Sequence, residues 1–182
     1  MTKRNTDTKK YIKDALAKLL SQKRFENITI SDLSRTAGIN RGTFYLHYTD
    51  KYDMMEKLKN ETLEDLFGIL SHDSIFTSKR IILLKLLSYL KDNFDFIFAL
   101  SQTSYVNFSQ TIKNFSYSFL ITIPRFEEAV TKYYGIPYDY AIELYLSSIE
   151  SIISLWVANG GKEDTEEITD IILKVVSLDK MI

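Results

Sequence analysis

The sequence predicts an all-α protein with an N-terminal three-helix domain containing a helix-turn-helix, followed by a helical body. Apolar residues recur three and four positions apart along most of the chain, which is the spacing of one face of a helix. Single glycines and prolines fall between these segments, where helices end. We place the boundary between the two domains at residue 51, so that they span 1–51 and 52–182.

The composition excludes several classes of protein. There is no cysteine, and the two histidines, His47 and His72, are far apart in sequence, so we expect neither a metal site nor a cofactor. No apolar run approaches about 18 residues and no charged-then-apolar leader follows Met1, so we expect a cytoplasmic protein that does not bind membranes. An enzyme is disfavoured because neither histidine has a recognisable catalytic partner and no glycine loop would hold a phosphate.

The charge is distributed unevenly along the chain. Residues 1–51 contain 11 lysines and arginines against five acidic residues, a net charge of +6, whereas residues 52–182 carry a net charge of −7. A basic segment attached to an acidic body is expected of a protein that binds a polyanion, because the acidic body is repelled by the same partner. The alternative is a chance division of solvated charges.

Two helices are predicted before residue 38. Residues 7–21 carry one apolar stripe, and a second, short helix begins after Thr29, which stands three residues before Asp32 in the spacing of a capping box. Gly38 supplies the positive φ that ends this second helix. The stripe of the first helix consists of Ile12, Ala15, Leu16, Leu19 and Leu20.

A third helix is predicted to begin at Arg41, with Asn40 as its cap. Two short helices joined by a tight glycine turn form a helix-turn-helix, here within residues 29–48. The second helix of this motif enters the DNA major groove and places its N-terminal residues on base edges. We expect Phe44 to point inward and Tyr45 outward.

The predicted contacts with DNA divide into base contacts and backbone contacts. Arg41 offers a fork that fits guanine, Thr43 offers a hydroxyl and a methyl, and Gly42 lets the backbone approach the duplex. Phosphate contacts are expected from the remaining polar residues, although Tyr45 and His47 could instead pack against the next helix. The full predicted set is Thr29, Asn40, Arg41, Gly42, Thr43, Tyr45, His47 and Lys51.

At these residues the sequence resembles the TetR family of bacterial transcription regulators. The family pattern Ala-Gly-Val, Ser-x-Gly-Thr-Leu-Tyr-x-His-Phe and then Lys is matched by AGI at 37–39, NRGTFYLHY at 40–48 and Lys51. Asn40 replaces a small hydroxyl residue and Tyr48 replaces Phe. The strong resemblance covers about residues 7–60. It implies a DNA-binding regulator, commonly a repressor released by an effector that binds the C-terminal domain.

The body is expected to begin with a long helix over 50–70, followed by a loop at 72–78 and a helix at 81–90. Residues 94–123 then mix aromatic and small polar side chains, a composition that is typical of ligand pockets. The alternative, that these aromatic side chains are core residues, stays open. Pro124 is expected to end or kink this segment. The candidate pocket residues are Phe94, Phe98, Tyr105, Phe108, Phe115, Tyr117 and Tyr145.

Residues 138–178 are predicted to form two helices at a homodimer interface, separated by Gly160-Gly161. Paired with their twofold copies, these helices would make a four-helix interface, and the alternative is a helix pair in the core of one chain. A twofold dimer places two recognition helices about 34 to 36 Å apart, so the DNA site should be pseudo-palindromic. The candidate interface residues are Ile149, Ile152, Ile153, Trp156, Ile168, Ile171, Ile172 and Val175.

The resulting interpretation is a sequence-specific, homodimeric regulator of transcription whose partners are double-stranded DNA and an unidentified effector. An effector that prefers one arrangement of the two DNA-binding domains would shift the dimer towards or away from the DNA-competent state. A second interpretation makes the body an interaction module for a protein partner, with activation in place of repression. Repression that is relieved by a small effector is what the resemblance implies, whereas the residues themselves identify neither the operator, the effector nor the sign of regulation.

Overall fold

A computed structural model describes residues 3–73 and 78–176 of the 182-residue chain, and the regular secondary structure of these residues is helical, with no strand among them. The predicted all-α fold is confirmed. Contacts divide the chain into two compact units. The first unit comprises residues 1–67 and 93–106, and the second comprises residues 68–92 and 107–182.

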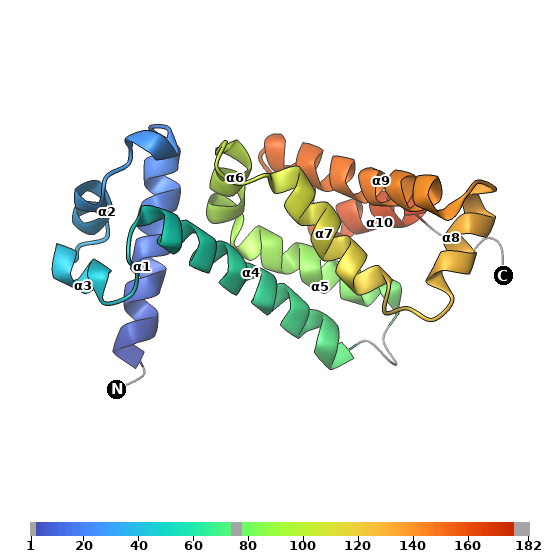
Figure 1. Ribbon diagram of the computed structural model, residues 1–182, viewed down its shortest axis with the longest axis horizontal. Helices are drawn as coiled ribbons and strands as arrows, with labels where there is room; N and C mark the ends of the chain where they lie inside the picture. The colour runs from blue at the N-terminus through green and yellow to red at the C-terminus, as the bar shows by residue number, and fades with distance from the viewer. Residues whose placement is uncertain (1–2, 74–77, 177–182) are drawn as a thin grey trace. The chain divides into compact units, whose positions relative to one another are not determined.

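The first unit contains the predicted helix-turn-helix and one helix from later in the chain (Figure 1). Its core is built from buried apolar residues of several helices, including Leu16, Leu33, Phe44 and Met55. The helix α6 packs against α1, so a segment that follows the long helix α4 completes this unit. The elements are α1 (Lys3–Leu20), the single 3-10 turn η1 (Phe25–Asn27), α2 (Ile30–Thr36), α3 (Arg41–Tyr45), most of α4 (Lys51–Asp73) and α6 (Phe94–Gln102).

The helix α4 begins where the sequence predicts and ends later. Asp50 caps it, since its Oδ1 accepts hydrogen bonds from the backbone N–H groups of Tyr52 and Asp53, both at 2.8 Å. The helix continues to Asp73 rather than ending at Leu70. Of the loop predicted at 72–78, residues 74–77 lie outside the described residues, while residues 72 and 73 are helical.

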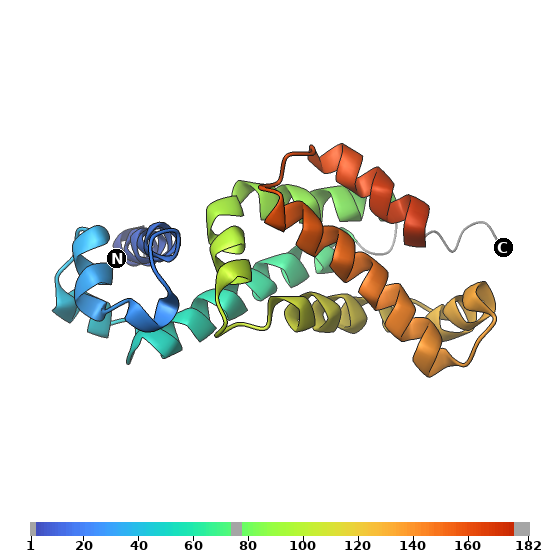
Figure 2. The same ribbon diagram turned by 90° about the horizontal axis from the view of Figure 1, so that it is seen from above.

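The second unit is arranged around α9, which packs against α7, α8 and α10 (Figures 1 and 2). The helix α5 packs against α10. The predicted stop at Gly160-Gly161 is confirmed, and α8 ends in the same way at Gly135, since all three glycines have positive φ. The elements are α5 (Lys79–Asp92), α7 (Phe108–Leu120), α8 (Phe126–Tyr134), α9 (Tyr138–Ala158) and α10 (Thr165–Val176).

The aromatic segment 94–123 is divided into two helices, α6 and α7, by a connection that the sequence analysis did not predict. Asn107 ends this connection by capping α7, because its Oδ1 accepts a hydrogen bond from the backbone N–H of Gln110 at 3.0 Å. The two parts of the segment also belong to different units, with α6 in the first and α7 in the second.

Three of the predicted dimer-interface residues are core residues of a single chain. Trp156, Ile168 and Ile172 are at most 3% exposed, and the Trp156 indole N–H donates to the Glu163 carbonyl at 3.1 Å. Because they have almost no surface to offer a second chain, we reassign them to the core, as the alternative interpretation allowed. Of the other five, Val175 is exposed, and Ile149, Ile152, Ile153 and Ile171 are half-buried.

The helix α9 is long and apolar enough to cross a membrane by length and composition alone. It contains three carboxylates, Asp139, Glu143 and Glu150, and it packs against three helices of its own unit. A core helix of a globular protein passes the same test of length and composition. The packing of α9 against these helices therefore accounts for its high hydropathy.

Candidate nucleic-acid interface

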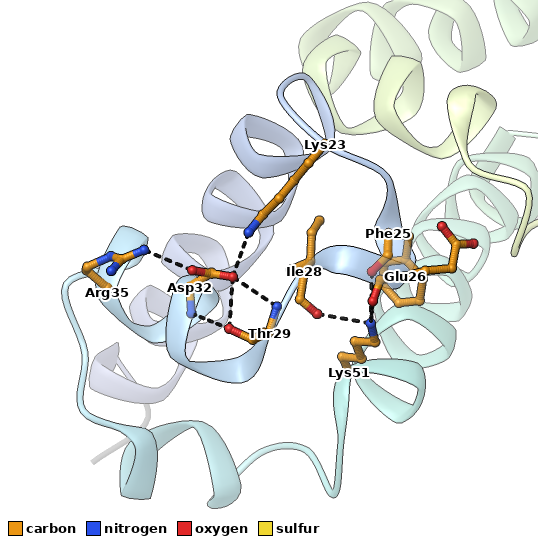
Figure 3. Close-up of polar contacts among 8 residues, drawn as sticks. All are labelled: Lys23, Phe25, Glu26, Ile28, Thr29, Asp32, Arg35 and Lys51. Atoms are coloured by element: carbon orange, nitrogen blue, oxygen red, sulfur yellow. Dashed lines mark hydrogen bonds and ion pairs between the residues drawn. The ribbon is translucent and has the colours of Figure 1, made fainter.

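The start of α2 is held by a network centred on Asp32 (Figure 3). The predicted capping box is confirmed: the Thr29 hydroxyl accepts from the Asp32 N–H, and the Thr29 N–H donates to Asp32 Oδ2, both at 3.1 Å. Lys23 and Arg35 donate to the same carboxylate at 2.6 and 2.8 Å. These contacts, first with Lys23 and then with Thr29, hold the pKa of Asp32 well below its usual range.

The polar groups of Thr29 are therefore already hydrogen-bonded within the chain, although the sequence analysis predicted that Thr29 contacts DNA. Its hydroxyl also donates to Asp32 Oδ2 at 2.8 Å, so both its N–H and its O–H are directed at this carboxylate. A phosphate contact through the Thr29 hydroxyl would have to replace that bond.

The turn between the two short helices has the geometry that the sequence predicts. Gly38 has a φ of +67°, which a residue with a Cβ seldom adopts. Asn40 caps α3, since its Oδ1 accepts hydrogen bonds from the Thr43 N–H at 2.7 Å and from the Thr43 hydroxyl at 3.0 Å. A Cβ on Gly42 would lie 3.2 Å from that same Oδ1, so Gly42 also leaves room for the cap.

The side chains of α3 separate into a buried and an exposed set, as predicted. Phe44 is fully buried, whereas Tyr45 is 51% exposed. Arg41 is also exposed, and within the described part of the chain no carboxylate forms an ion pair with it. Arg41 and Tyr45 are thus available to an external polyanion, and the half-buried Thr43 keeps its methyl and hydroxyl at the start of the same helix.

His47 follows α3 and is half-buried beside Tyr48, with a distance of 6.0 Å between the two ring centroids. The Lys57 ammonium donates to the His47 carbonyl at 3.4 Å and pairs with Asp53 at 2.9 Å. These contacts hold the chain that follows α3 against α4. They do not test whether the His47 side chain contacts a phosphate, which stays a prediction.

Lys51 has a different role from the predicted phosphate contact (Figure 3). Its ammonium donates to the carbonyl oxygens of Phe25, Glu26 and Ile28 at 2.9, 2.7 and 3.0 Å. An ammonium group has three donors, so all of them are used within the chain. We therefore reassign Lys51 from DNA contact to the stabilisation of η1 and of the chain that leads into α2.

Two features of this surface were missed by the sequence analysis. Lys23 pairs with Asp32 across nine positions of sequence, and no local pattern signals such a pair. Leu46, directly after α3, is 83% exposed. The signal in the sequence was an apolar leucine among the polar residues of the motif, and it could have identified Leu46 as a residue of the exposed surface.

The candidate pocket residues do not gather in one unit. Phe94, Phe98 and Tyr105 belong to the first unit, and Tyr105 lies against Phe25 and Tyr52, so we withdraw it from the predicted pocket. The other candidates, Phe108, Phe115, Tyr117 and Tyr145, belong to the second unit. Tyr145 packs against Phe126 and donates its hydroxyl hydrogen to the Val176 carbonyl at 3.2 Å, which favours a core role.

An open hollow of about 420 Å³ lies in the first unit, beside α1 and α4. Its lining is mostly polar and charged, and none of the candidate pocket residues is part of it. The lining residues are Lys9, His47, Tyr48, Lys57, Asn60, Glu61 and Glu64.

The capped helices, the positive-φ turn and the exposed side chains of α3 define a helix-turn-helix DNA-binding protein. Comparison with known proteins agrees: the family described as "Bacterial regulatory proteins, tetR family" matches residues 12–58, and "Transcriptional regulator C-terminal region" matches residues 80–178. The chain belongs to the TetR family of transcription regulators, whose members regulate transcription rather than catalyse reactions.

Individual relatives share parts of this description. Over an alignment of 74 residues, which covers 38% of this chain and 20% of the relative's length, the chain is 32% identical to the uncharacterized HTH-type transcriptional regulator YxbF of Bacillus subtilis (strain 168). The dihydroxyacetone kinase operon activator DhaS has the same fold, with a TM-score of 0.65, 19% identity and 93% coverage of both chains. The regulator FadR of Bacillus subtilis, solved with stearoyl-CoA, gives a TM-score of 0.63 at 17% identity, with 91% of this chain and 96% of FadR covered.

Proposed function

We propose that this chain is a cytoplasmic, homodimeric repressor that binds a pseudo-palindromic operator and is controlled by an effector. The observation that carries the proposal is α3, whose first residues Arg41 and Thr43 are presented by the Asn40 cap and whose Tyr45 is exposed. A guanidinium fork at the start of a recognition helix suits a guanine edge in the major groove. Tyr45 supplies a hydroxyl for the DNA backbone.

Support for a homodimer comes from the unpacked face of α9. Tyr140, Leu144 and Leu155 are 69%, 48% and 62% exposed, and they recur at intervals that keep them on one side of the helix. Ser147 and Ser151 lie between them at the same spacing, and small residues permit close approach of a second helix. We propose that this face, with Ile152 and Val175, replaces the buried residues first predicted for the interface.

The interface can be tested by changing the oligomeric state. Leu155→Glu places a charge in the proposed contact, so we expect sedimentation to show a dimer for the unaltered protein and a monomer for the variant. Leu46→Glu, which adds the same charge to an exposed leucine of the first unit, should remain dimeric. A monomeric unaltered protein, or a dimeric Leu155→Glu variant, would exclude this interface.

The proposed control by an effector is supported by the division of the chain into two units, and α4 is one of the segments that connect them. Helix α4 runs without a break from the first unit into the second. An effector that binds one arrangement of the second units more tightly would therefore shift the population of DNA-competent dimers. FadR, which shares the fold, was solved with stearoyl-CoA, and this supports control by an effector without identifying the effector of this chain or its site.

A second candidate is an activator whose second unit binds a protein partner. The fold shared with DhaS, which is described as an operon activator, favours this alternative for the sign of regulation. A reporter gene placed under the operator separates the two candidates: deletion of the regulator raises expression if it represses and lowers expression if it activates.

DNA binding is tested with a labelled fragment from directly upstream of the protein's own gene, a scrambled fragment of the same length, and a series of salt concentrations. We expect the unaltered protein to prefer the cognate fragment by at least about a thousandfold. Arg41→Ala should lose most of this preference. Arg24→Ala, which removes the same charge from an exposed arginine of the same unit, should retain it.

The salt series distinguishes the possible failures. Equal binding to both fragments with a steep dependence on salt would mean that the first unit contributes only general electrostatic attraction to this fragment. No binding at low salt would exclude the proposed function.

A further inference from the structure

We propose that Tyr105 is a positioning residue for DNA binding, which acts through Phe25 and Lys51 on the segment that leads into α2. The proposal rests on the proposed function, since it concerns the same helix-turn-helix. Tyr105 follows α6 and is separated from α2 by about seventy positions of sequence. It nevertheless belongs to the first unit.

Tyr105 lies in an aromatic cluster with Phe25 of η1 and Tyr52 of α4. The ring centroid of Tyr105 is 5.3 Å from that of Phe25 and 5.2 Å from that of Tyr52, and the Phe25–Tyr52 distance is 5.5 Å. All three distances fall within the range in which aromatic rings attract one another. Each ring therefore contacts the other two.

Lys51 connects this cluster to the backbone before α2. Its ammonium lies 5.0 Å from the Phe25 ring centroid and 5.3 Å from that of Tyr52, within the range of a cation–π interaction. The same ammonium binds the carbonyls of residues 25, 26 and 28. The last of these residues directly precedes Thr29, the cap of α2, so the cluster constrains where α2 begins.

The connection that carries Tyr105 is itself anchored to the first unit. Thr103 and Val106 are buried, and the Tyr105 N–H donates to the Thr103 hydroxyl at 3.2 Å. The Ser104 hydroxyl donates to the Glu26 carboxylate at 3.1 Å. Residues on both sides of Tyr105 are therefore fixed, and the ring is placed against Phe25 rather than left to sample solvent.

Positioning, rather than bulk stability, is the expected contribution of this side chain. Phe25 is buried, whereas Tyr105 is 38% exposed. Its truncation leaves the core of the first unit in place but removes the ring that holds Phe25 and Lys51 in one arrangement. α2 and α3 would then sample more positions, and each subunit would bind its half-site less tightly.

The proposal is tested by a double-mutant cycle on operator binding, using full-length Tyr105→Ala, Lys51→Met and the combined variant. We expect Tyr105→Ala to weaken binding about tenfold, which is the scale of one aromatic contact, with no change in the salt slope because no phosphate contact is lost. In the Lys51→Met background the same substitution should weaken binding less than about twofold. Tyr105→Phe should bind like the unaltered protein, as should Tyr11→Ala, which truncates an exposed tyrosine of α1.

A second measurement does not depend on an operator. Hydrogen exchange in the DNA-free protein should be faster over residues 25–36 in Tyr105→Ala than in the unaltered protein, and unchanged in α9. Unaltered exchange there, full operator affinity of Tyr105→Ala, or additive losses in the double variant would overturn the proposal. If the unaltered protein binds no DNA at low salt, the proposed function fails, and the exchange result still decides whether Tyr105 positions α2.

Discussion

Replacing Lys51 by methionine separates a structural role from a DNA-contacting role. Methionine keeps the aliphatic stem but removes three hydrogen bonds to backbone carbonyls. The Glu26 carbonyl is exposed and can bind water instead, so only the part-buried bonds to Phe25 and Ile28 count fully. At about 1.5 kcal/mol each, the low end for a charged donor, the variant should lose about 3 kcal/mol of stability.

This loss has a measurable size. For a chain of this length about 1 kcal/mol corresponds to 2–4 °C, so thermal unfolding followed by circular dichroism should show a midpoint lowered by about 6–12 °C. The matched control is Lys18→Met, which removes an exposed lysine of α1 and should change the midpoint by no more than about 2 °C.

The salt dependence of operator binding provides the refuting result. If Lys51 contacted a phosphate, its loss would reduce the slope of log affinity against log salt concentration by about 0.9 per subunit. The structural role predicts an unchanged slope, because the ammonium is already bound to carbonyls. A reduced slope together with an unchanged unfolding midpoint would show that our reassignment of Lys51 is wrong.

Three further outcomes are expected. Tyr45→Phe removes an exposed hydroxyl that is proposed to bind the DNA backbone, so gel-shift titration should show operator and scrambled DNA weakened by a similar factor of about five; a selective loss on the operator would instead indicate a base contact. Ser34→Ala removes a buried hydroxyl without a hydrogen-bond partner among the described residues and should raise the unfolding midpoint by about 2–4 °C; a lower midpoint would mean that this hydroxyl has a partner. The lowered pKa of Asp32, caused first by Lys23, contributes stability that is present at neutral pH and is lost progressively as the pH falls below about 3.9. Asp32→Asn should therefore be less stable at pH 7, and its midpoint should fall less than that of the unaltered protein between pH 5 and pH 3; equal falls would contradict this assignment.

Local features were predicted well because their causes lie within a few residues. The capping box at Thr29 depends on a carboxylate three positions away, and the turn at Gly38 depends on the absence of a Cβ. The separation of Phe44 from Tyr45 follows from helical periodicity. Each of these features is confirmed by the structure.

Features that depend on distant residues could not be predicted in the same way. The motif places a lysine at position 51, but its use depends on three carbonyls more than twenty positions earlier. An apolar stripe likewise does not say whether it faces its own chain or a second one, so Trp156, Ile168 and Ile172 were assigned to an interface although α9 and α10 bury them within one chain. The pattern identifies a buried face, and only the tertiary structure identifies what covers it.

The order of segments in the first unit has a consequence for attempts to divide this protein. Because α6 packs on α1 and belongs to the first unit, a fragment that ends after the helix-turn-helix or after α4 lacks a helix that covers part of its core. Such a fragment would expose apolar surface and tend to aggregate. A chimera that gives this regulator the DNA specificity of a relative should therefore exchange residues 1–67 and 93–106 together, or substitute only the exposed residues of α3.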